Sequence, residues 1–204
     1  GSRPQIEELM GLRKLEGQFY KGVRITGPQE LECVKEACGE TRFDIEAAFS
    51  QGLPNTPMQH SRIKVVSGNF VTARPMGIID GVDYLHTGVV RKVDAESIQD
   101  LLSRGNIVLV SPTGFSPTGE AFNLTTEDVA TAIAVAIRAD KLILSVGVDG
   151  VRVRGEKQQD LTAQQAQALI QGKQVDDEDV YNLGYALRAT KRPSASTSTA
   201  SPAP

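Results

Sequence analysis

The chain has 204 residues, of which 40% are hydrophobic and 23% are charged, and its formal net charge is −3. This length suffices for one well-cored domain or for part of a larger one. Acidic and basic residues are interspersed, so no basic groove for nucleic acid is predicted. No apolar run reaches the roughly 18–20 residues that a membrane span needs, and no secretory signal is visible. With two reduced thiols, we expect a cytoplasmic protein without nucleic-acid or membrane partners.

Helices alternate with short extended segments in the first half of the chain. Gln5 to Leu15 is helix-like and leads into a short basic loop or strand around Arg24. Pro28 opens a long helix that Gly39 can interrupt, and on this helix Cys33 and Cys38 are predicted to be packed thiols without a mutual disulfide. The elements expected next are strands over 63–66 and 70–73, an edge strand over 84–93, and a helix over 95–102 that Asp94 caps and Gly105 ends.

The stretch from Asn106 to Leu144 is the most informative part of the chain. A short buried strand, Ile107 to Val110, is followed by two predicted turns, 112–114 and 117–119, on either side of Phe115. Thr125 and Asp128 have the spacing of a capping box and open an apolar helix, and a second buried strand is expected over 142–144. Strand, glycine-bearing loop, helix and strand form the unit that builds parallel sheets. This pattern predicts a small-ligand site near residues 111–114 and 123–127.

The last quarter of the sequence predicts less order. We expect a strand or hairpin over 146–153, a helix over 164–171 and a solvated surface turn over the acidic run 176–179. The tail from 190 to 204 is rich in Ser, Thr, Ala and Pro and is expected to be disordered. The predicted organisation is therefore a domain over residues 1–189 followed by that tail.

The best constellation for chemistry combines Arg24, Asn123 and the helix start at Thr125–Asp128. A guanidinium can hold a carboxylate, an Asn amide can fix a carbonyl, and free helix N–H groups attract an anion. Together they suit an acylated amino acid. The alternative is that Arg24 is a surface cation and Asn123 a turn residue, and the pattern alone leaves both open. No catalytic triad, complete phosphate loop or metal site can be assembled from the sequence.

Several segments carry a family resemblance. The chain resembles the amino acid kinase-like domain of bacterial N-acetylglutamate synthase, the amino-acid N-acetyltransferase that opens arginine biosynthesis. Agreement is nearly continuous from Gly1 to about Leu144, and the Asp-Gly-Val-Asp-Tyr run at 80–84 and the Ser-Pro-Thr-Gly-Glu-Ala-Phe-Asn run at 116–123 separate the synthase from its sister, N-acetylglutamate kinase. The other matching segments are 1–7, 22–26, 31–35, 65–75, 85–88, 108–115 and 127–131.

The resemblance implies a three-layer α/β/α sandwich with a mainly parallel sheet, of the carbamate-kinase type. In the sister kinases an Arg and an Asn bind N-acetylglutamate, and Arg24 and Asn123 match those positions. Gly1 and Ser2 fall on the glycine-rich substrate loop, and Glu127 aligns with the catalytic Asp of the kinases. The longer carboxylate and the lost glycine indicate that phosphoryl transfer was abandoned. We therefore expect no catalytic residue in this chain.

The resemblance also implies a fragment. The kinases' first strand, with the Lys and paired glycines that contact phosphates, has no counterpart, and neither does the acetyltransferase domain that would bind acetyl-CoA and glutamate. In the full-length family that domain does the chemistry, while the kinase-like domain assembles a homo-oligomer and receives the arginine signal. We expect this chain to be the regulatory and oligomerisation part, with no bound cofactor and no activity alone. An active N-acetylglutamate kinase-like enzyme and a non-catalytic binding or subunit-interaction module remain as alternatives.

Overall fold

The computed structural model describes residues 1–51, 63–145, 151–153, 156–158, 160–175 and 177–190. The chain divides into two compact units, Gly1–Ile137 and Arg138–Pro204, which are taken in turn. The helices of the first unit are α1 (Arg3–Leu12), α2 (Pro28–Ser50), α3 (Ala95–Ser103) and α4 (Thr126–Ala136). Its strands are β1 (Gln18–Tyr20), β2 (Val23–Ile25), β3 (Val65–Ser67), β4 (Val71–Pro75), β5 (Ile78–Ile79), β6 (Val82–Asp83), β7 (Gly88–Val93), β8 (Ile107–Leu109), β9 (Thr113–Phe115) and β10 (Ala121–Asn123).

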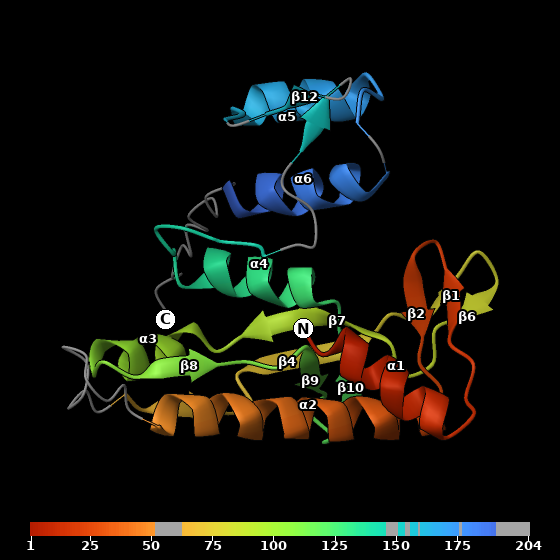
Figure 1. The fold of residues 1–204 in the computed structure, drawn as a ribbon, viewed down its shortest axis with the longest axis vertical. Coiled ribbons are helices and arrows are strands. Elements are labelled where there is room, and N and C mark those ends of the chain that lie inside the picture. The colour runs from red at the N-terminus through yellow and green to blue at the C-terminus, as the bar shows by residue number, and fades with distance from the viewer. Residues whose placement is uncertain (52–62, 146–150, 154–155, 159, 176, 191–204) are drawn as a thin grey trace, which may run out of the picture. The chain divides into compact units, whose positions relative to one another are not determined.

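The first unit has the predicted α/β/α arrangement, with α4 on one side of the strands and α2 on the other (Figure 1). Four strands form a mixed sheet in the order β10-β9-β4-β7, in which β4 and β9 run parallel and the other neighbours run antiparallel. Strands β3 and β8 form a separate parallel pair. This arrangement confirms the predicted α/β/α fold class. The four-stranded sheet is mixed where a mainly parallel one was expected, because the tight turn at 117–119 makes β9 and β10 antiparallel and β4 also pairs antiparallel with β7.

Two apolar clusters hold this unit together. One lies between α1 and α2, where Ile6 and Met10 pack on Val34 and on the buried thiols of Cys33 and Cys38, which form no disulfide. The other lies between β4, β10 and α4, and its buried members are Val71, Ala73, Phe122, Leu124 and Val129. Burial of such side chains is the main force that stabilises a domain of this size.

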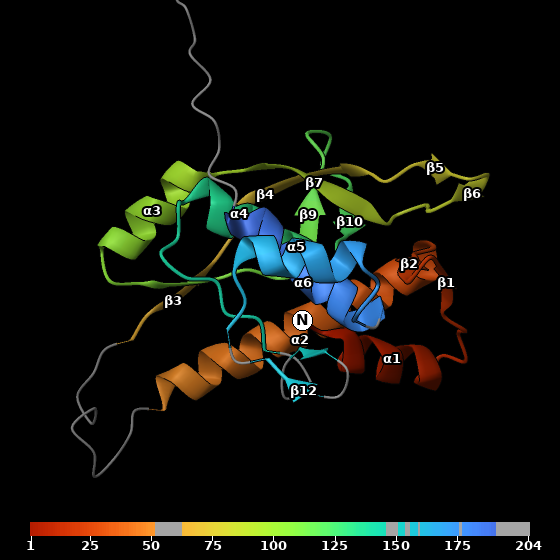
Figure 2. The same cartoon turned by 90° about the horizontal axis from the view of Figure 1, so that it is seen from above.

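Two hairpins lie side by side at one end of the unit, β1–β2 and β5–β6 (Figure 2). Lys21 in the first hairpin's turn forms an ion pair with Asp80 in the second, and Tyr84 Oη donates to the Tyr20 carbonyl at 3.1 Å. The rings of Tyr20 and Tyr84 meet edge to face with centroids 6.4 Å apart. The first hairpin carries Arg24, so these contacts fix the position of that residue.

Several predicted elements are corrected by the structure. Helix α2 runs without a break through Gly39, because its neighbours supply enough packing to offset the low helix propensity of one glycine. Thr113–Phe115 is not a turn but strand β9, and only the turn at 117–119 joins it to β10. Residues 142–144 form no strand, and Ile143 is 76% exposed, since no strand among the described residues pairs with this segment.

The second unit contains β11 (Arg152–Val153), β12 (Glu156–Lys157), α5 (Ala163–Gln171) and α6 (Asp177–Thr190). Helix α5 confirms the predicted helix. The acidic run does not form a turn where the structure describes it, because Asp177 already begins α6. Most of the predicted 146–153 hairpin and nearly all of the 190–204 tail lie outside the described residues, and the predicted domain boundary stays a prediction.

Candidate functional site

The predicted ligand residues lie around the N-termini of three helices. Gly1 precedes Ser2, the buried N-cap of α1, and a Cβ placed on Gly1 would be 2.8 Å from Thr126 Oγ1 at the start of α4. Gly1 therefore lies against the Thr126 side chain at the start of α4. Asn123 stands two residues before Thr125, the N-cap of α4. Gly1, Ser2 and Asn123 thus come from distant elements to one part of the first unit.

A small buried network connects Asn123 to the start of α2. Asn123 Nδ2 donates to Thr26 Oγ1 at 3.0 Å, and the hydroxyls of Thr26 and Thr87 share a hydrogen bond of 2.8 Å. Thr87 Oγ1 donates to the Arg24 carbonyl at 2.6 Å and accepts from the Thr26 amide at 3.1 Å. Both threonines are at most 2% exposed. Thr26 stands directly before Gly27, the N-cap of α2, so the network holds the starts of α2 and α4 together.

These three helix starts have no side-chain cap within the part of the chain that the structure describes. Away from the site, Asp94 accepts from the Ser97 amide at the start of α3, and Thr162 accepts from the Gln165 amide at the start of α5. The predicted capping box at Thr125 is therefore wrong, since its hydroxyl makes no capping bond. An uncapped helix start presents N–H donors and the positive end of the helix dipole, which favours an anion.

The three helix starts differ in the charges close to them. Glu127 and Asp128 stand in the first turn of α4, and the Glu30 side chain folds back over Gly27 at the start of α2, 2.4 Å from where a Cβ would lie. The first turn of α1 has no acidic residue and carries Arg3. Carboxylates near the positive end of a helix partly neutralise it. The start of α1, with Gly1 and Ser2, is therefore the most electropositive of the three.

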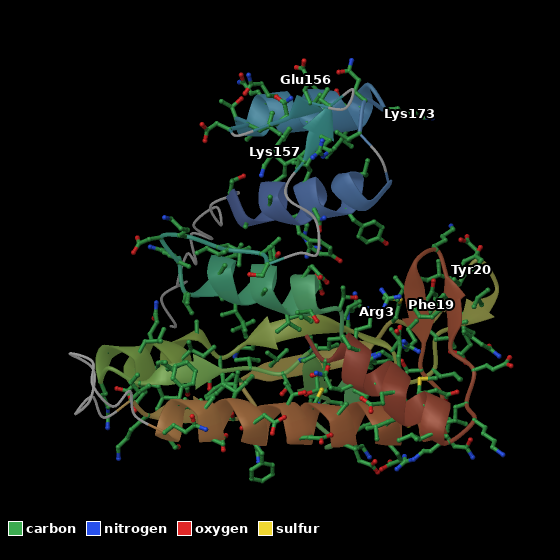
Figure 3. The ribbon with its side chains drawn as sticks, in the orientation of Figure 1. Arg3, Phe19, Tyr20, Glu156, Lys157 and Lys173 are labelled. Carbon is green, nitrogen blue, oxygen red and sulfur yellow. The ribbon has the colours of Figure 1, made fainter. Side chains whose placement is uncertain are left out.

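The backbone of Arg24 lies at this site, while its guanidinium group points toward α1. Nη2 lies 3.2 Å from Glu7 Oε1, Nη1 lies 3.2 Å from Met10 Sδ, and the group sits 4.6 Å from the centre of the Phe19 ring. Only 9% of the side chain is exposed, and burial lowers the pKa of Arg24, with the Glu7 carboxylate acting in the opposite direction. Figure 3 shows Phe19 on the β1–β2 hairpin close to Arg3 of α1.

Glu127, which the resemblance aligns with a kinase catalytic Asp, occupies the second position of α4 and is partly buried. Its place at the helix start agrees with a carboxylate near the predicted ligand position. Sequence reasoning missed Thr26 and Thr87, which tie the site together. Thr26 lies at the junction between a strand and a helix that begins with proline, and this junction is a signal in the sequence. The local sequence around Thr87 contains no such signal.

The other predicted part of the site, residues 111–114, borders a separate cleft of about 250 Å³. This cleft opens where the parallel strands β3 and β8 end. Its lining combines one cation with hydroxyl, amide and apolar groups, contributed by Arg42, Ser67, Gly68, Asn69, Val71, Leu109, Val110, Ser111, Thr113 and Phe115. Ligands in open α/β sheets bind at such strand ends, so the cleft is a second place for a small molecule.

Among the described residues, no group of three or more His, Cys, Asp or Glu side chains could hold a metal ion. The helices in the same residues include none that is long and apolar enough to cross a membrane.

The chain is similar to known proteins in sequence and in structure. A model of the amino acid kinase family matches residues 1–181. An amino-acid acetyltransferase of Ralstonia nicotianae is 55% identical over 192 residues, which are 94% of this chain and 43% of that protein. The enzyme of the same name from Aeromonas salmonicida is 44% identical over 93% of this chain and 43% of its own length. The chain thus spans about two fifths of these curated relatives.

Solved structures of an N-acetylglutamate synthase are also similar to this chain. The N-acetylglutamate synthase of Neisseria gonorrhoeae, complexed with coenzyme A and N-acetyl-glutamate, superposes with a TM-score of 0.80 at 32% identity, covering 93% of this chain and 42% of that one. A second structure of that synthase, with coenzyme A and L-arginine, has the same TM-score and identity and is covered to 44%.

Proposed function

Because the chain belongs to the amino acid kinase family, we propose that it is the kinase-like part of an amino-acid N-acetyltransferase, an N-acetylglutamate synthase of arginine biosynthesis. In this proposal the part binds an acylated amino acid and contributes to subunit assembly and arginine regulation. The transfer itself, with glutamate and acetyl-CoA as substrates, belongs to the rest of a full-length protein in the cytoplasm. The coenzyme A in the Neisseria structures supports acetyl-CoA as the acetyl donor of that whole protein.

The observation that carries the binding role is the meeting of three uncapped helix starts beside Asn123. N–H groups at helix starts bind carboxylates, and hydrogen bonds to a charged group contribute about 1.5–3 kcal/mol each. The Asn123 amide can meet the acyl carbonyl of the ligand once its bond to Thr26 is exchanged. An acylated amino acid presents both groups, which is why it fits better than a free phosphate or a free amine.

A titration with N-acetyl-L-glutamate, followed by calorimetry, tests this role. Wild-type chain is expected to give saturable binding, and Asn123→Leu is expected to weaken it by at least about tenfold, because the removed amide leaves the ligand carbonyl without a partner. Asn69→Leu, at the separate cleft, is the matched control and should bind like wild type. Loss of binding in Asn69→Leu with normal binding in Asn123→Leu would move the site to the cleft, and no heat in any protein would refute the binding role.

A kinase-like activity is the second candidate, favoured by the position of Glu127 at the start of α4. We expect no ATP-dependent phosphorylation of N-acetylglutamate, because the resemblance places the longer Glu127 where the kinases carry a catalytic Asp, and Ser2 where their substrate loop carries a glycine. ADP release that requires N-acetylglutamate would favour this candidate over a purely binding role.

A further inference from the structure

Glu7 places its carboxylate beside Arg24, the cation that the sequence predicts for the ligand site. Its Oε1 is 3.2 Å from Arg24 Nη2 and 3.0 Å from Arg3 Nε, so this one oxygen accepts from two guanidinium groups. Both guanidiniums also lie over the Phe19 ring, at 4.6 Å for Arg24 and 5.5 Å for Arg3. Two cations, one aromatic ring and the Glu7 carboxylate therefore form one cluster between α1 and the β1–β2 hairpin, in which Arg24 is buried and the other three groups are open to solvent.

The two partners of this ion pair differ in how tightly the fold holds them. The Arg24 side chain is 9% exposed and packs against Met10 and Phe19, so its position is fixed. Half of the Glu7 side chain is exposed, at 51%, so its carboxylate can turn into water. An ion pair with one exposed partner contributes little to stability, which makes it easy to exchange. A buried guanidinium still requires some anion beside it.

We propose that Glu7 is an internal competitor for the carboxylate ligand of this site, so that binding requires Glu7 to leave Arg24. This inference rests on the proposed binding role and adds the residue that sets its affinity. The ligand carboxylate replaces the Glu7 carboxylate beside Arg24, while the N–H groups at the start of α1 take part of its charge. In this proposal Glu7 is either paired with Arg24 or released, and only the released state binds the ligand. The observed association constant is therefore that of the released state multiplied by the fraction of protein in that state.

The test titrates N-acetyl-L-glutamate into wild type, Glu7→Gln, Glu7→Asp and Glu8→Gln. Glu7→Gln removes the competing charge, and Glu7→Asp keeps the charge on a side chain shorter by one methylene. Both are expected to bind roughly two- to fivefold more tightly than wild type. Glu8→Gln removes the same charge from a neighbouring exposed position on α1 and is expected to bind like wild type. Glu7→Asp keeps the proposal testable if loss of the charge at residue 7 prevents folding.

Equal binding by Glu7→Gln and Glu8→Gln would overturn the inference, because only net charge would then matter. Weaker binding by the Glu7 variants would also overturn it and would make Glu7 a residue that positions Arg24. Both results leave the proposed binding role intact. Absence of binding in all four proteins would refute the competitor and the binding role together.

Discussion

At the scale of single residues, Thr87 links the segments that form the site. Its hydroxyl joins the Arg24 carbonyl, the Thr26 hydroxyl and the Thr26 amide, and all of these lie in a buried region. A buried polar group that loses its partner costs more free energy than the bond itself contributes. The geometry of Asn123, three hydrogen bonds away from the Arg24 carbonyl, therefore depends on a residue that contacts no ligand in the proposed role.

Replacing Thr87 by Val should lower the free energy of unfolding by about 1–3 kcal/mol, because the Arg24 carbonyl and the Thr26 amide lose a partner. Urea denaturation measures this change. Thr131→Val is the matched control, since Thr131 is 2% exposed and its hydroxyl has no hydrogen-bond partner among the described residues. That control should be neutral or stabilising. Equal losses in both variants would show that the volume or shape of the side chain matters and the Thr87 network does not.

The sequence predicted which polar residues belong together but not their direct partners. Gly1, Ser2, Arg24 and Asn123 were linked through a family resemblance, and the structure brings them to the same part of the first unit. The contact between Arg24 and Glu7 joins residues 17 positions apart, and it depends on how the β1–β2 hairpin packs on α1. Such packing is set by tertiary structure, which neither periodicity nor composition encodes locally.

At the scale of elements, agreement was best where a local signal was strong. Helix α3 begins at the predicted Asp94 cap, and α5 begins with a formed capping box at Thr162. Prediction failed where long-range pairing decides. Thr113–Phe115 has turn composition but becomes a strand because β4 and β10 pair with it. Residues 142–144 have strand composition but pair with no strand in the part of the chain that the structure describes. Strand formation requires a neighbour, and the local sequence does not supply one.

Gly39→Ala tests the continuity of α2. A Cβ at this position would meet no atom within 4 Å outside the helix's own backbone, and alanine is the better helix former, so the free energy of unfolding should rise by about 0.5–1 kcal/mol. Gly88→Ala gives the contrast, because its Cβ would lie 2.9 Å from the Arg74 carbonyl and 2.7 Å from Phe122 Cβ. A destabilised Gly39→Ala in thermal melts would mean that α2 needs a break there after all.

The Asp94 cap of α3 predicts a pH dependence. Hydrogen bonds from the Ser97 side chain and backbone lower the pKa of Asp94 from its ordinary value of 3.8. A carboxyl group with a lowered folded-state pKa stabilises the fold above its unfolded pKa, and this contribution is lost as pH falls through the folded pKa. Asp94→Asn can still accept from the Ser97 amide but carries no charge. The difference in Tm between wild type and Asp94→Asn should therefore stay constant from neutral pH to about pH 5 and shrink as the pH falls through the ordinary pKa of 3.8 to the lower folded pKa. A constant difference over that range would contradict a role for the charge.

At the scale of the whole molecule, the chain matches about two fifths of its curated relatives' length and belongs to the amino acid kinase family. The proposed division of work follows from the site. In this proposal the helix starts and the Asn123 amide hold an acylated amino acid in place, and Glu7 and Arg24 set its affinity. Binding by this part and chemistry by the remainder would let a signal molecule act on one region while acetyl transfer takes place in another.

The most direct test is a titration of isotope-labelled chain with N-acetyl-L-glutamate, observed through its backbone amide resonances. The account predicts saturable shifts that are largest at the first-turn amides of α1, α2 and α4, namely Arg3, Gln5, Gln29, Glu30, Thr126 and Glu127. Shifts centred on Asn69 and Ser111, or no shift at any ligand concentration, would contradict it.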